Sequence, residues 1–145
     1  MILQHNNQNG LAAVEMLLVT PVLLMLLVGI MEMGRIFIEY TTLNKAVQAG
    51  ARYALIDVYG AQPQGTLAST SQIKNVVVYG KKSSGGDKVL DGLSTSDVSV
   101  DTSNAEHVTV TAVYSYTPLF SNIPFTSTSL TMNLTASASM RRSGI

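Results

Sequence analysis

The chain has 145 residues, a formal net charge of zero and only 12% charged residues. This balance argues against a nucleic-acid-binding surface, which would be basic. The chain has no cysteine, which excludes disulfides, thiolate zinc sites and thiol catalysis. Its length suits one small domain in addition to the apolar N-terminal segment considered below.

The first ten residues, 1–10, are polar and rich in Asn and Gln, and we predict that they form a disordered leader peptide. They include His5 but neither Lys nor Arg.

The segment that follows the leader is strongly apolar, with no charged residue from Met16 to Met31. As a helix, residues 11–31 would span about 31 Å, close to the ~30 Å hydrocarbon core of a bilayer. A cleaved secretory signal would have a basic start and a shorter apolar run, and a core helix of a soluble domain would normally have a polar face. We therefore predict one transmembrane helix over residues 11–34.

Two residues in this segment are unusual for a simple anchor. Glu15 is a carboxylate in an apolar helix, which costs about 2.5–3.5 kcal/mol at the bilayer centre and less near its edge. It is either harmless at the headgroup level or retained for a partner. Pro21 removes a backbone donor and so predicts a kink or a loosened turn, although proline is also common in membrane helices.

The string from Gly10 to Arg35, GLAAVEMLLVTPVLLMLLVGIMEMGR, resembles the TadE-like pseudopilins (minor pilins) of tight-adherence, type IVb-like pilus systems. In that family a membrane peptidase cuts after the Gly, which implies a processing site at Gly10 and Leu11. The resemblance further implies that Glu15 pairs with the Leu11 amine of a neighbouring subunit, and that Pro21 accompanies local melting of the helix during assembly. The C-terminal run 136–142 also resembles the end of that family.

The same resemblance implies a single-pass protein of the bacterial inner membrane, with residues 60–145 exported. It implies a role in the assembly of an extracellular pilus for surface adhesion, or incorporation into it. The implied partners are a prepilin peptidase, other pilin or pseudopilin subunits, the inner-membrane pilus assembly machinery and the lipid membrane.

An uncleaved single-pass membrane protein whose exported domain binds a partner is the alternative. The missing Lys and Arg in the leader support it, because pilin leaders usually carry one. The positive-inside rule, taken alone, would place the C-terminal domain in the cytoplasm, since Arg35 and Lys45 lie on that flank.

Residues 35–59 continue the helical pattern as an amphipathic extension, which Gly60 and Pro63 would end. The apolar positions recur at three- and four-residue steps, with Glu39 and Lys45 mostly elsewhere. The predicted buried face comprises Ile36, Tyr40, Leu43, Val47, Ala51 and Ala54.

We predict that residues 60–145 form an α+β domain. After a loop at 60–69, residues 70–79 favour a short helix, although the β-branched run at 76–78 also suits a strand. A surface loop follows at 80–88. Strict alternation then predicts strands around 98–100, 108–116 and 130–140, with an irregular connection at 119–128. A small antiparallel sheet packed on the amphipathic half of the long helix is also the pilin-like architecture.

The sequence offers little catalytic chemistry, and we predict that the chain is not an enzyme and has no cofactor or metal. His107 and Glu106 suit a solvated strand end better than an acid–base pair. Asp97, Asp101 and Asn104 add oxygen ligands near one loop, but the spacing matches no calcium loop.

Overall fold

A computed structural model describes residues 8–60, 67–120, 122 and 129–142. Most of the predicted leader, with His5, lies outside the described residues. So do residues 61–66 of the predicted loop, with Pro63, and most of the predicted connection at 119–128. The elements are helices α1 (Gln8–Gly60) and α2 (Thr70–Tyr79), a 3-10 turn η1 (Thr95–Asp97), and strands β1 (Val98–Asp101), β2 (His107–Tyr116) and β3 (Met132–Arg141).

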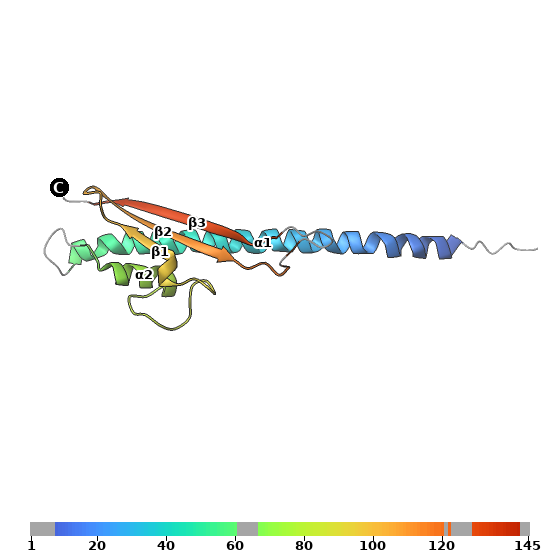
Figure 1. Ribbon diagram of the computed structural model, residues 1–145, viewed down its shortest axis with the longest axis horizontal. Helices are drawn as coiled ribbons and strands as arrows, with labels where there is room; N and C mark the ends of the chain where they lie inside the picture. Colours follow the sequence, from blue (N-terminus) through green and yellow to red (C-terminus); the bar gives the residue numbers. More distant parts are fainter. Residues whose placement is uncertain (1–7, 61–66, 121, 123–128, 143–145) are drawn as a thin grey trace, which may run out of the picture.

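α1 is the axis of the molecule. It is one continuous helix of 53 residues that includes Pro21, as the sequence predicts for the anchor and its extension. Its N-terminal half projects beyond all other elements, and its C-terminal half is flanked by α2 and the sheet (Figure 1). At about 1.5 Å per residue, the helix is roughly 80 Å long.

The C-terminal half of α1 buries the face that the spacing predicts, with one exception. Leu43, Val47 and Ala54 are fully buried, and burying an aliphatic side chain of the size of Leu or Val contributes about 1.5–3 kcal/mol. Tyr40, predicted to be buried, is 42% exposed. The buried stripe passes instead through Glu39, which is half-buried. Residues 39 and 40 both lie at helical spacing from Leu43, but the sheet covers only residue 39.

The ambiguous segment at 70–79 is a helix, so the preferred prediction is confirmed. Ser69 caps its N-terminus by accepting a hydrogen bond from the backbone of Gln72, and Gly80 ends it with φ +67°. These caps outweigh the strand preference of the β-branched run. α2 lies close against α1, because a Cβ atom placed on Gly50 would collide with the side chain of Val77.

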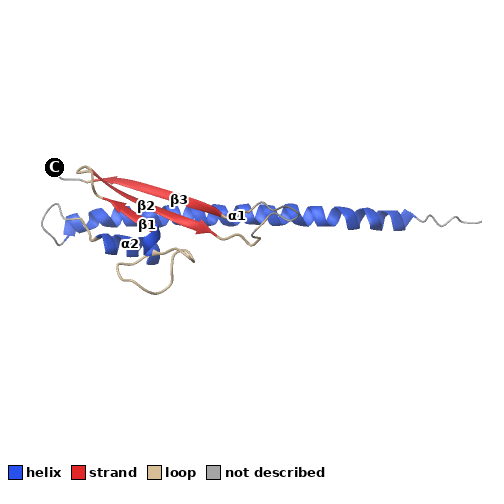
Figure 2. Cartoon of the chain, viewed as in Figure 1, coloured by secondary structure: helices blue, strands red, loops and turns tan. Residues whose placement is uncertain are grey.

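The three strands form one antiparallel sheet in the order β1–β2–β3 (Figure 2). Val110 in the central strand pairs with Val100 of β1 and with Ala138 of β3. The alternating apolar residues of β2 face the helices, as predicted. β3 begins at Met132 rather than at Leu130. The α+β architecture, a long helix with a small antiparallel sheet, is therefore confirmed.

Candidate functional site

The projecting half of α1 presents an apolar surface. α1 contains one stretch long and apolar enough to cross a membrane, and none of its most apolar window is buried. Leu11 is 75% exposed and Leu17 is 76% exposed. A soluble protein rarely leaves a contiguous apolar surface of this size uncovered, so this half of α1 fits a single-pass membrane anchor.

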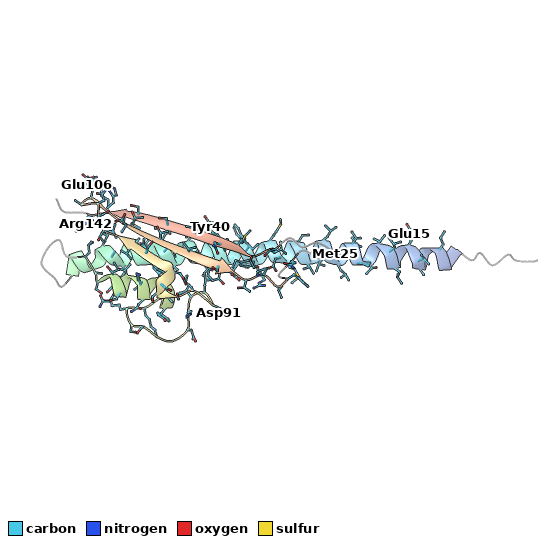
Figure 3. The ribbon with its side chains drawn as sticks, viewed as in Figure 1. Glu15, Met25, Tyr40, Asp91, Glu106 and Arg142 are labelled. Carbon is cyan, nitrogen blue, oxygen red and sulfur yellow. The ribbon has the colours of Figure 1, made fainter. Side chains whose placement is uncertain are left out.

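The four site residues predicted from the sequence all lie on this half. Gly10 and Leu11 are in the first turns of α1, Glu15 follows Leu11 by about one turn, and Pro21 lies further along. Glu15 lies on the part of the helix that extends past the sheet (Figure 3). It is exposed, and no described residue hydrogen-bonds or pairs with it. Within one chain, its carboxylate therefore has no partner in the described structure.

At Pro21 the helix continues without interruption. Proline provides no N–H for the carbonyl one turn earlier. The carbonyl that lacks this N–H is that of Leu17, whereas the Thr20 hydroxyl donates at 2.6 Å to the preceding carbonyl, that of Met16. No contact joins any of the four predicted residues to the described part of the C-terminal domain.

Where α1 meets the sheet, the structure contains a polar junction that the sequence did not predict. We define the polar junction as Glu32, Arg35, Glu39, Tyr114 and Tyr116. Glu32 is only 8% exposed. Its Oε1 accepts hydrogen bonds from the Tyr116 hydroxyl at 2.6 Å and from the Leu119 backbone N–H at 3.1 Å. These bonds join α1 to the end of β2.

Arg35 balances the two carboxylates of the polar junction. Its guanidinium lies 3.7 Å from Glu32 Oε2 and 3.5 Å from Glu39 Oε1, and its Cζ lies 5.8 Å from the centre of the Tyr116 ring. Glu32 Oε2 is buried without a hydrogen bond to any described residue, so the arginine is the cation that offsets its charge. Because the Arg35 side chain is 41% exposed, solvent screens both ion pairs, and each contributes less than a fully buried pair would.

Both tyrosines of the polar junction are held in their neutral form. Burial and the hydrogen bond to Glu32 raise the pKa of Tyr116 to about 12. The pKa of Tyr114 is raised to about 12, mainly by burial and secondly by the nearby Glu39 carboxylate. The Tyr114 hydroxyl donates to the Asp91 backbone carbonyl at 3.0 Å. A tyrosine must keep its proton to donate to the Glu32 carboxylate or to the Asp91 backbone carbonyl, so the protonation state fits both hydrogen bonds.

The polar junction changes how the apolar segment ends. The first charged residues after Met31 are Glu32 and Arg35. Glu32 is bound to Tyr116 and Leu119 of the domain, and Arg35 pairs with Glu32 and Glu39. On the free side of α1, Phe37 is 68% exposed and Ile38 is 63% exposed. The exposed apolar surface of α1 therefore runs from Leu11 to Ile38, about 40 Å along the helix axis.

The acidic residues considered as calcium ligands serve local turns. Asp97 accepts from the backbone and hydroxyl of Ser94. Asp101 accepts from the backbone and hydroxyl of Ser103, which lowers its pKa. Among the described residues, no group of three or more His, Asp or Glu side chains is arranged to hold a metal ion.

Comparison with known proteins identifies a family for the N-terminal part of the chain. Residues 10–52 match the model of the TadE-like protein family, consistent with a TadE-like pilin of the tight-adherence system. The match includes all four predicted site residues and the three helix residues of the polar junction. No curated protein and no solved structure matches the chain. The resemblance drawn from the string Gly10 to Arg35 is thereby confirmed, and the matching family is structural rather than enzymatic.

Proposed function

We propose that this chain, TadE-like over residues 10–52, is a membrane-anchored pseudopilin (minor pilin) that a prepilin peptidase cleaves after Gly10. The processed subunit assembles or joins an extracellular, tight-adherence-type pilus used for surface adhesion. Its single-pass anchor lies in the bacterial inner membrane, with residues 60–145 exported. Its partners are other pilin subunits and the inner-membrane assembly machinery.

One observation carries this proposal: Glu15 is exposed on an apolar helix, without a described partner, within the stretch that matches the family. Leaving a carboxylate unpaired in lipid costs free energy. Cleavage after Gly10 would create a positively charged amine on Leu11. Pairing of that amine with Glu15 of a neighbouring subunit offsets the desolvation of both groups in the apolar core of an assembly.

Hydrophobic burial supplies the drive for assembly. The side chains of the projecting half of α1 are mostly more than half exposed in the single chain. Packing against the same half of other subunits would bury them while satisfying the Glu15 charge. Pro21 would let the helix loosen locally as the subunit leaves the bilayer.

The N-terminal mass of the protein from membranes tests the processing step, measured with and without the prepilin peptidase. A mature chain that begins at Leu11 only when the peptidase is present supports the proposal. An intact Met1 in both samples refutes it.

The assembly step is tested with Glu15→Ala, with Glu15→Gln as a variant that removes the charge but keeps the shape. Both variants are expected to insert and to be cleaved, yet to be lost from the sheared filament fraction. Normal piliation in either variant removes the Glu15 charge from the mechanism.

An uncleaved single-pass protein that binds a partner through its exported domain is the second candidate. The leader contains neither Lys nor Arg. In addition, α1 begins at Gln8, so the Gly10–Leu11 bond lies inside a helical turn that would have to open for cleavage. The mass measurement separates the two candidates.

A further inference from the structure

The cavity beside the polar junction lies where the membrane span should be. It measures about 560 Å³ and is bounded by α1 and by both ends of the chain segment that connects β2 to β3. Its lining is almost entirely apolar and includes Leu24, Met25 and Val28 from α1, and Phe120, Leu130 and Met132 from the domain.

The length of α1 constrains where the bilayer can be. If the hydrocarbon core ended before Leu24, the helix would have only the run from Leu11 to Leu24, about 20 Å, to cross a core of ~30 Å. Starting the span at Gln8, the first residue of α1, would extend it only to about 24 Å. The span must therefore include Met25 and Val28, which line the cavity together with Phe120.

The domain residues at this level have the chemistry of a lipid-facing surface. Leu119 is 63% exposed, Phe120 is 47% exposed and Met132 is 46% exposed. They continue the exposed apolar surface of α1 and line or adjoin the same cavity. Glu32 is the one charged residue of the described cavity lining, and it is bound by Tyr116, Leu119 and Arg35. The described surface here consequently offers lipid no unpaired charge.

We propose that the membrane-proximal edge of the domain, Leu119, Phe120, Leu130 and Met132, inserts into the lipid leaflet on the domain's side, and that acyl chains occupy the cavity. The inference rests on the proposed membrane span of residues 11–34. The domain is then held at a fixed depth and orientation on the bilayer by α1 and by the residues next to the end of β2 and the start of β3.

The absence of native cysteine allows a direct test in the full chain. Single-cysteine variants Phe120→Cys and Met132→Cys are labelled with a polarity-sensitive fluorophore and placed in nanodiscs at one chain per disc. Quenching is measured with lipids that carry a spin label on the acyl chain. Leu23→Cys, 57% exposed on the projecting half of α1, is the control within the span. Ser137→Cys, exposed near the middle of β3, is the control in water.

The expected result is a blue-shifted emission at positions 120 and 132, with quenching close to that at position 23 and well above that at position 137. If the labels at positions 120 and 132 are quenched as weakly as the label at 137, while the label at 23 is quenched, the inference is overturned but the membrane span stands. An unquenched position 23 refutes the span itself. The label at position 120 could instead show a blue shift only in discs that hold several chains, without quenching by the spin-labelled lipid. That result would assign the cavity to a second copy of the chain and overturn the inference.

Discussion

The bond between Tyr116 and Glu32 is expected to hold the sheet on α1, and Tyr116→Phe tests this. The change removes one hydroxyl from a residue that is only 2% exposed and leaves the ring in place. The variant loses the 2.6 Å hydrogen bond from the Tyr116 hydroxyl to the buried Glu32 carboxylate. Hydrogen bonds to charged groups contribute about 1.5–3 kcal/mol, so we expect a loss of about 2 kcal/mol.

Hydrogen exchange of the full chain in detergent micelles, followed by mass spectrometry, measures this loss locally. A free-energy change of ~2 kcal/mol corresponds to roughly 30-fold faster exchange wherever the amides exchange through separation of the sheet from α1. The peptides to compare are those of β2 and the one that contains Leu119, whose N–H also donates to Glu32.

Tyr40→Phe is the matched control, because it removes the same hydroxyl from a tyrosine of α1 that is 42% exposed. Exposed substitutions of this kind usually change stability by less than about 0.5 kcal/mol. If Tyr116→Phe accelerates exchange in β2 no more than Tyr40→Phe does, the polar junction does not hold the sheet, and the reasoning fails.

Two further predictions concern packing and pH. Gly50→Ala should destabilise the chain by about 1–3 kcal/mol in denaturant titrations because the new Cβ collides with Val77. Gly34→Ala is the control and should not destabilise the chain, because no atom lies within 4 Å of the added Cβ. Equal denaturation midpoints for the two variants would contradict the close packing of α1 and α2. Because the pKa values of Tyr114 and Tyr116 rise from 10.0 to about 12 on folding, the native state retains these protons more tightly than the unfolded chain. Their stabilisation is therefore complete below pH 10 and is lost between pH 10 and 12; stability that stays flat across this range in alkaline denaturation would refute the assignment.

Local patterns in the sequence account for most of the fold. Alternation of apolar and polar residues predicts β2, because the strand has one face on the helices and one in solvent. Three- and four-residue spacing predicts that Leu43 and Val47 are buried. The helix at 70–79 was harder to predict, since Val76–Val78 favours a strand, and the caps at Ser69 and Gly80 decide it.

The polar junction could not be predicted because its contacts join distant parts of the chain. Glu32 and Tyr116 are 84 positions apart, and no local periodicity links them. Spacing alone also treats Glu39 and Tyr40 as equivalent candidates for the buried face. Only the position of the sheet on α1 selects Glu39, and Arg35 makes its burial tolerable. A charged residue that continues the apolar stripe of a helix is the signal that could have identified this site.

The continuous helix also has a mechanical consequence. β2 and β3 lie nearly along α1 (Figure 1), and their backbone hydrogen bonds run across the strands. A force that pulls α1 along its axis reaches the sheet through the Glu32–Tyr116 bond at the end of β2 and through the apolar core between α1 and both strands. It therefore loads the β2–β3 ladder in shear, so that many bonds must yield together. A sideways force on β3 would instead open the ladder one bond at a time. This subunit should thus resist axial traction far better than lateral peeling.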